Sequence, residues 1–249
     1  MWRNVRRWRG VILIGAAVVA TLWLAVGNQL VLYIHPRYIV FTVLMAALAV
    51  VFVVASALRG HGDEDEEPAP RRAGTAVSVA AVVAGVAVAV VMVALPPATL
   101  SSATAGQRDI NGSNIAADAQ TVSEVESAPV GAFAAFTVKD WSSLLRQTTD
   151  LDFYADKPVD IVGFITADPD DPQNVFYVSR FVVTCCAVDA QPLGVPVYFE
   201  NWQDSFQLDQ WVQATGELGA NPSQRSTEPI ALDPDSVTIV EQPGEPYLF

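Results

Sequence analysis

One stretch of the sequence joins a β-strand pattern to a cysteine pair: residues 175–190 read VFYVSRFVVTCCAVDA. Aromatic and β-branched residues favour strands, so residues 175–184 predict a strand that ends at the cysteines. Further short segments of strand character lie at 158–167, 195–199, 211–218 and 236–240. Five short strands, with a longer interruption between the third and fourth, predict a small all-β, OB-like barrel. A β-sandwich is the alternative.

These strands fall within Phe136–Phe249, a region long enough for an independent core. Gly163 and Gly216 lie inside two of the predicted strands and mark points where a barrel bends. The apolar pattern of Asp140–Thr148 predicts a short helix. Residues 98–135 are rich in Ser, Ala, Thr, Asn, Asp and Gly with little periodicity, which predicts a flexible stalk.

The first part of the chain has a different composition. The whole sequence of 249 residues is 51% hydrophobic and 16% charged, and the apolar excess lies before the stalk. Val11–Leu32, Tyr38–Leu58 and Thr75–Leu95 contain no charged residue, and each has about the length that a helix needs to cross a bilayer. We therefore expect a membrane domain at residues 1–97 with three transmembrane helices. Three successive apolar stretches also favour an anchor over a cleaved signal peptide.

The basic residues predict the orientation of these helices. They are Arg3, Arg6, Arg7 and Arg9 before the first apolar stretch and Arg59, Arg71 and Arg72 between the second and third. Basic segments stay on the cytoplasmic side, so the N-terminus is expected to be cytoplasmic. Three crossings then place the C-terminal domain outside, and the protein is predicted to be a multi-pass protein of the cell membrane.

Charge and residue usage exclude several classes of function. The formal net charge is −13, and beyond residue 98 six basic residues stand against 22 acidic residues, giving −16. Such a domain is a poor nucleic-acid binder, because phosphate affinity comes from Lys and Arg. The C-terminal domain has no His, and no nucleophile–base pair can be assembled from its motifs. We expect a non-enzymatic protein.

The candidate site is the cysteine pair with the following acid: Cys185, Cys186 and Asp189. Two thiolates and a carboxylate are ligands for a thiophilic ion such as zinc. Successive strand side chains point to opposite faces, so both thiols reach one ion only if the strand ends or kinks at Cys185. A strained vicinal disulfide is the second interpretation, and two buried structural cysteines are the third.

One further ligand is available on the predicted outer face of the membrane. His35 lies in the short turn between the first two apolar stretches, beside Pro36. Through a flexible stalk it could contribute an imidazole to the cysteine site, although a lone His at a helix start is more often structural. Without it the ligand set is incomplete, which fits transient handover better than storage.

Several motifs together resemble one family. They are Tyr33-Ile34-His35-Pro36-Arg37-Tyr38, Asp140-Trp141, Val162-Gly163-Phe164, Arg180-Phe181, Cys185-Cys186-Ala187 with Asp189-Ala190, Trp211-Val212 with Thr215-Gly216, and Pro246-Tyr247-Leu248. The chain in this respect is similar to the YcgQ-like family of bacterial membrane proteins, which are described as permease subunits. The resemblance implies membrane helices before an OB-like extracytoplasmic domain. It also implies a partner, a larger integral-membrane permease of the type linked to metal or metalloid transport.

The sequence therefore predicts a membrane accessory subunit of a permease that contacts a thiophilic metal or metalloid ion through its outer domain. The alternative is an extracytoplasmic thiol-redox or envelope scaffold protein without bound cargo.

Overall fold

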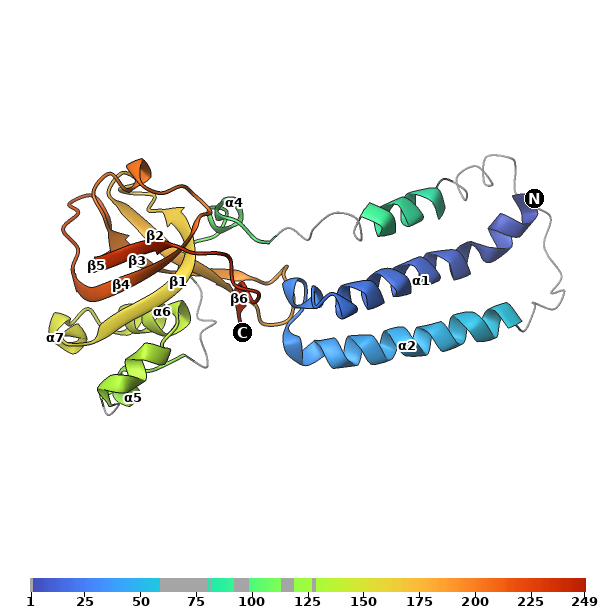
Figure 1. The fold of residues 1–249 in the computed structure, drawn as a ribbon, viewed down its shortest axis with the longest axis horizontal. Coiled ribbons are helices and arrows are strands. Elements are labelled where there is room, and N and C mark those ends of the chain that lie inside the picture. Colours follow the sequence, from blue (N-terminus) through green and yellow to red (C-terminus); the bar gives the residue numbers. More distant parts are fainter. Residues whose placement is uncertain (1, 59–79, 81, 92–98, 113–118, 127–128) are drawn as a thin grey trace. The chain divides into compact units, whose positions relative to one another are not determined.

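The computed structural model describes residues 2–58, 80, 82–91, 99–112, 119–126 and 129–249. The chain divides into two compact units, Met1–Ala98 and Thr99–Phe249. Figure 1 shows apolar helices in the first unit and a β-sheet ring in the second.

The first unit is built on two apolar helices. Helices α1 (Trp2–Val26) and α2 (Pro36–Leu58) pack side by side, joined through the 3₁₀ turn η1 (Leu30–Leu32) (Figure 1). Within the described residues, one helical segment, Pro36–Ala55, is long and apolar enough to cross a membrane. Residues 82–91 form a further, shorter apolar helix.

The structure interrupts the first predicted membrane helix and describes only part of the third. The predicted span Val11–Leu32 is interrupted, because α1 ends at Val26. Asn28 takes a left-handed conformation, and the amides of Asn28 and Gln29 donate to carbonyls of the last helical turn. This is the usual way in which a backbone leaves a helix. Of the third span, Thr75–Leu95, only residue 80 and residues 82–91 are described; the remainder, with Arg59, Arg71 and Arg72, lies outside the described residues.

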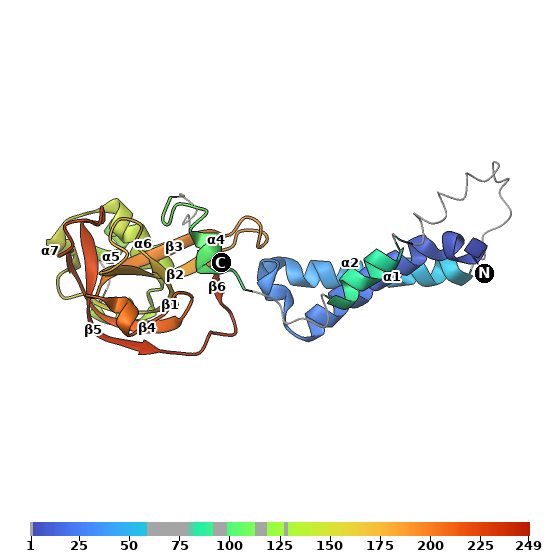
Figure 2. The same cartoon turned by 90° about the horizontal axis from the view of Figure 1, so that it is seen from above.

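The second unit is a closed ring of five strands, as the OB-like prediction requires. The strands are β1 (Pro158–Ala167), β2 (Val175–Val182), β3 (Gln191–Tyr198), β4 (Trp211–Ala220) and β5 (Ile230–Ile239). Their order is β1-β4-β5-β3-β2, and an added β1–β2 pairing closes the ring. The short strand β6 (Tyr247–Leu248) pairs parallel with the end of β2 (Figure 2). The predicted fold class is confirmed.

Two glycines make the closure of the ring possible. β1 pairs with β4 up to Phe164 and with β2 from Phe164 onward, so it bends beside Gly163. A Cβ at Gly163 would lie 2.5 Å from the carbonyl oxygen of Ser179, closer than real side chains approach. Gly216 lies at a register shift opposite Pro234. Both strands therefore bend where the sequence places glycine.

Helices cover one opening of the ring. Helix α6 (Val138–Gln147) packs against β3 and β2 (Figure 2) and buries Trp141 and Leu144 in the core. A capping box between Thr137 and Asp140 fixes its first turn. The remaining short helices of this unit are α4 (Ser102–Ala105), α5 (Val122–Glu126), η2 (Val130–Ala135), α7 (Leu151–Tyr154) and η3 (Trp202–Asp204).

The segment for which a flexible stalk is predicted contributes to the domain in its described residues. Val125 and Phe133 are buried in the hydrophobic core together with Phe136. β3 pairs with β5 only at Val197, and Asn111 binds the earlier part of β3: its side chain exchanges two hydrogen bonds of 2.9 Å with the backbone of Gly194. Its amide donates to the carbonyl of Pro192. The apolar residues of this segment are too widely spaced to show a period, so its composition suggests a linker. Their side chains nevertheless bury apolar surface in the core.

Candidate metal centre

The cysteines lie in a tight loop directly after β2. The strand ends at Val182, and the amide of Val183 donates to the carbonyl of Leu248 in the terminal segment. From Thr184 to Asp189, which we name the Cys loop, the chain bends and turns. The strand therefore ends before Cys185, which is the condition the sequence sets for both thiols to reach one ion.

The carboxylate of Asp189 closes the Cys loop. It accepts a 2.8 Å hydrogen bond from the amide of Cys185 and a 3.2 Å hydrogen bond from the amide of Thr184. The amide of Asp189 in turn donates to the carbonyl of Cys186 at 3.0 Å. Asp189 thus holds the backbone that presents the two thiols, besides offering an oxygen of its own.

The three predicted ligands converge. One ligand atom from each of Cys185, Cys186 and Asp189 lies within 4.8 Å of the others, and the two Sγ atoms are 3.5 Å apart. Two Zn–S bonds of about 2.3 Å at the tetrahedral angle would place the sulfurs about 3.8 Å apart. The thiols are therefore close to the separation that one thiophilic ion requires, and a small side-chain rotation completes it. In the described residues, this is the one cluster of three such ligands.

The electrostatics of the loop keep the thiol protonated when no ion is bound. Hydrogen bonding to Asp189, and then to Cys186, raises the pKa of the Cys185 thiol to about 12. Burial disfavours the charge of Asp189, but hydrogen bonds from the Cys185 side chain and from loop amides hold the pKa of Asp189 below its ordinary value. A thiol of this kind is a poor nucleophile for disulfide exchange. A metal ion would have to displace its proton, as metal ions do at thiol sites.

The rim of the loop is open to solvent. Cys185 is exposed, Cys186 is half-buried, and the side chain of Val188 is 82% exposed. The open side leaves room for a ligand from outside the domain, as in zinc sites that bind three protein groups and one exchangeable group. Neither thiol forms a disulfide, and the exposure of Cys185 argues against the interpretation as two buried structural cysteines.

His35, the fourth predicted ligand, belongs to the first unit. Its Nδ1 accepts a 3.1 Å hydrogen bond from the amide of Arg37, and its ring packs edge-on against Tyr38. Its contribution to the cysteine site stays a prediction. Sequence reasoning missed a residue of the second unit: Arg108, whose Nη2 donates to the carbonyl of Val188 at 3.1 Å. The two residues are 80 positions apart, and no signal in the sequence pairs them.

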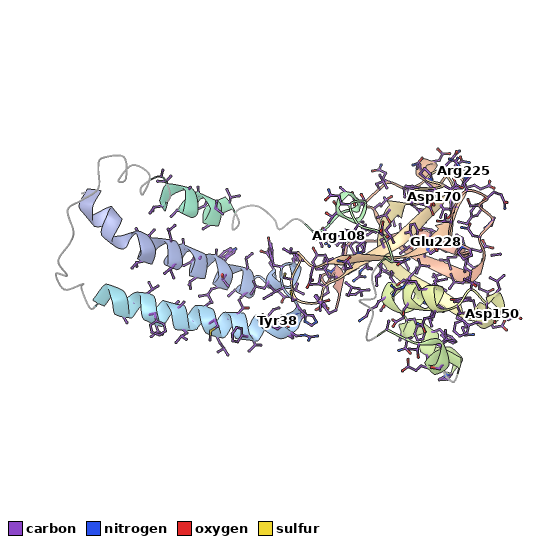
Figure 3. The ribbon with its side chains drawn as sticks, turned by 180° about the vertical axis from the view of Figure 1, so that it is seen from behind. Tyr38, Arg108, Asp150, Asp170, Arg225 and Glu228 are labelled. Carbon is purple, nitrogen blue, oxygen red and sulfur yellow. The ribbon has the colours of Figure 1, made fainter. Side chains whose placement is uncertain are left out.

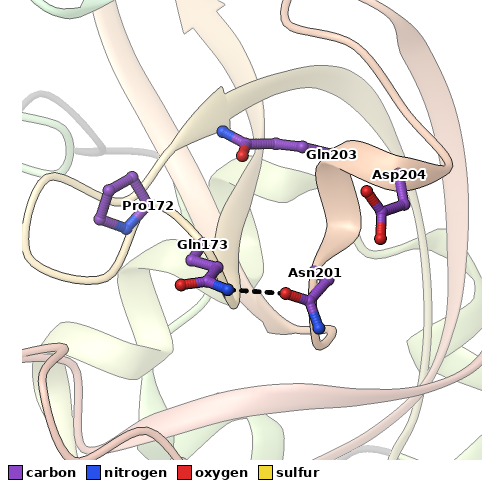
Figure 4. A pocket seen from close by; sticks show the side chains of 5 residues that line it. All are labelled: Pro172, Gln173, Asn201, Gln203 and Asp204. Carbon is purple, nitrogen blue, oxygen red and sulfur yellow. Dashed lines mark hydrogen bonds between the residues drawn. The ribbon is translucent and has the colours of Figure 1, made fainter.

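A separate hollow of about 320 Å³ lies away from this chemistry, between η3 and the β1–β2 loop (Figure 4). It is lined by Pro172, Gln173, Asn201, Gln203 and Asp204. Gln173 donates a 2.7 Å hydrogen bond to Asn201 across it. None of these five described residues carries a thiol or an imidazole, the side chains that a soft ion prefers.

Fold and site together define a closed β-ring domain that presents a dithiol–carboxylate loop, on a chain with apolar helices before it. Residues 134–249 match the family model described as the DUF1980 C-terminal domain. The comparison with curated proteins found no match, and neither did the comparison with solved structures. The match covers the ring and the Cys loop and leaves Arg108 outside its bounds.

Proposed function

We propose that the protein is a membrane-anchored, non-enzymatic accessory subunit of a permease whose outer domain binds a thiophilic ion, such as zinc, and passes it on. The observation that carries the proposal is the convergence of Cys185, Cys186 and Asp189 on one point of an exposed loop. Three protein ligands with an open fourth position suit transfer of the ion, because a partner can add its own ligand before the ion dissociates from the first three.

The competing redox function is less well supported by the same loop. Redox-active thiols have lowered pKa values and attack as thiolates. The Cys185 thiol has a raised pKa instead, because Asp189 holds its proton. The raised pKa of the thiol does not prevent metal binding, because a divalent ion replaces the proton and forms bonds to two thiolates.

Metal uptake by the reduced full-length chain tests the proposal. In detergent, Zn²⁺ affinity measured by chelator competition should fall strongly in Cys185→Ser and in Cys186→Ser. Asp189→Asn should weaken binding less, because a carboxylate is the harder and more replaceable ligand. Val188→Ala, which changes the loop without removing a ligand, is the matched control and should bind as the wild type. Equal affinity in both serine variants and the wild type would refute the metal site.

Thiol trapping separates the redox alternative. Cells are quenched with an alkylating reagent, and the peptide holding Cys185 and Cys186 is weighed by mass spectrometry. We expect both thiols to be alkylated after quenching. A peptide two hydrogens lighter than the reduced form, without alkylation, would identify a vicinal disulfide and favour the redox function.

The membrane part of the proposal has its own tests. In a background without Cys185 and Cys186, Ser102→Cys should be labelled in intact cells by an impermeant reagent, whereas Gly62→Cys should not. Labelling at residue 62 would reverse the proposed orientation. Purification from native membranes should recover a larger integral-membrane permease together with bound metal, and recovery of the chain alone would argue against the partner.

A further inference from the structure

A basic side chain reaches the Cys loop from a distant part of the second unit. Nη2 of Arg108 donates a 3.1 Å hydrogen bond to the carbonyl of Val188, which lies between Cys186 and Asp189. Figure 3 labels Arg108 at the edge of the β-ring domain. The contact is to backbone, so it fixes the position of the loop without using any of the three candidate ligands.

The segment that carries Arg108 is firmly attached. Three residues later, Asn111 binds the backbone of Gly194 through both ends of its amide, and its own amide donates to Pro192. Nη1 of Arg146 donates to the carbonyl of Asn111 at 3.3 Å. These contacts hold the segment on β3, the strand that follows the Cys loop, so the guanidinium of Arg108 has a defined place.

The second terminal nitrogen of Arg108 is unusual. Nη1 is buried and, within the described part of the chain, has no hydrogen-bond partner. A buried donor on a charged group is costly to leave unpaired. Arg108 therefore brings a positive charge, with one donor still unpaired, to the backbone of the residue that directly precedes the candidate ligand Asp189.

The three candidate ligands carry more negative charge than a divalent ion can cancel. Two thiolates and one carboxylate carry three negative charges, and a divalent ion cancels two of them. The remaining charge would sit in a domain with 22 acidic and six basic residues beyond residue 98. We propose that Arg108 is a positioning residue of the metal site: it holds the Cys loop through Val188 and supplies the positive charge that balances the ion-bound ligand set. This inference rests on the proposed function, because it needs the thiols to bind an ion.

Metal affinity of Arg108 variants in the full-length protein tests the inference. Arg108→Gln keeps a donor for the carbonyl of Val188 but removes the charge, and Zn²⁺ affinity should fall about tenfold, as for other groups that support metal ligands. Arg108→Lys keeps the charge and should recover most of that loss. Asn111→Ala loosens the same segment with the charge intact and should change the affinity less than Arg108→Gln does.

Co²⁺ supplies a readout that a merely structural role would not move. At saturating Co²⁺, Arg108→Gln should retain the thiolate-to-metal absorption of the wild type, since the ligands are unchanged, but should need about tenfold more ion to reach it. Wild-type affinity in Arg108→Gln, or an equal loss in Asn111→Ala, would overturn the role of Arg108 while leaving the metal site intact. Absence of the thiolate absorption in the wild type would instead overturn the proposed function, and this inference with it.

Discussion

The guanidinium of Arg180 is bound to the carbonyl of Pro246: its Nε donates a 2.9 Å hydrogen bond to that oxygen. Its two terminal nitrogens donate to the carbonyls of Glu245 and Val162. Arg180 also lies over the ring of Trp211. Burial lowers the pKa of Arg180 to about 10, so the group stays charged at neutral pH. One side chain of β2 therefore ties the C-terminal segment to the ring, directly before the Cys loop.

Replacing Arg180 should release that segment. Arg180→Met removes three hydrogen bonds from a charged donor, and we expect a loss of about 3 kcal/mol in the free energy of unfolding. Arg180→Lys should rescue little, because an ammonium cannot span three carbonyls in a plane. Urea unfolding measures the loss, and faster exchange of the Val183 amide, which bonds to Leu248, would locate it. Full protection of that amide in Arg180→Met would show that β6 does not depend on Arg180.

The bend of β1 gives a second prediction. A Cβ on Gly163 would meet the carbonyl oxygen of Ser179 at 2.5 Å, and backbone cannot yield as a flexible side chain does. Gly163→Ala should cost about 2 kcal/mol or more in the free energy of unfolding. Gly219→Ala is the matched control, since it also lies in a strand but has open space around its Cβ position, and should change stability by less than about 0.5 kcal/mol. Equal stability of the two variants would show that the ring relaxes at Gly163.

Acids of the β1–β2 loop bind hydroxyls of the β4–β5 loop. Figure 3 labels one residue of each loop, Asp170 and Arg225, close to each other. The pairs are Asp171 with Ser223 at 2.7 Å, Asp168 with Ser226 at 2.8 Å and Asp170 with Thr227 at 2.9 Å. Asp168 and Asp171 are buried, whereas Asp170 is exposed. Not all acids of this domain are solvated at the surface: Asp168 and Asp171 are buried and join the two loops.

Asp171 predicts the pH dependence of stability. Burial opposes its charge, yet hydrogen bonds from Ser223 and Asn174 and the charge of Arg225 hold the pKa of Asp171 below its ordinary value of 3.8. A depressed pKa contributes stability above the unfolded pKa, and that contribution is lost as the pH falls through the folded value. Unfolding in urea between pH 7 and pH 2 should show a steeper acid loss for the wild type than for Asp171→Asn.

Asp170→Asn is the control for that prediction. Its partner is also a hydroxyl, but the carboxylate is exposed, so Asp170→Asn should change the free energy of unfolding at pH 7 by less than about 0.5 kcal/mol. At pH 7, Asp171→Asn should cost about 1–3 kcal/mol, the range for a lost hydrogen bond to a charged group. An unchanged acid profile in Asp171→Asn would mean that another carboxylate dominates acid unfolding.

Local signals explain how much of the fold the sequence predicts. β1 has its predicted range, because it is rich in β-branched and aromatic residues and pairs first with β4 and then with β2. β5 begins at Ile230, six residues before the predicted strand. The prediction starts too late because Asp233-Pro234 resembles a break in a strand. A register shift opposite Gly216 accommodates this proline, which is a property of the neighbouring strand.

The same distinction holds at the candidate site. Cys185, Cys186 and Asp189 lie within five residues, so a turn alone brings them together and the sequence can reveal them. Arg108 reaches the loop only because Asn111 binds Gly194 on β3, a contact between segments 83 residues apart. No periodicity or motif predicts such a pairing, because it depends on the part of β3 that β5 leaves unpaired.

The domain boundary supplies the last prediction. The sequence suggests that Phe136–Phe249 folds alone, but the core of the second unit also contains Val125 and Phe133. The ring of Phe133 contacts those of Phe136 and Trp141, with centroids 5.4 and 6.2 Å apart. Loss of a buried aromatic costs about 3–5 kcal/mol.

Residues 99–249, expressed with export to the periplasm, should unfold cooperatively, whereas residues 136–249 should be less stable by several kcal/mol, as for such a loss. Circular dichroism during urea unfolding compares the two fragments. Equal midpoints and slopes would show that the segment before residue 136 lies on the domain without stabilising it.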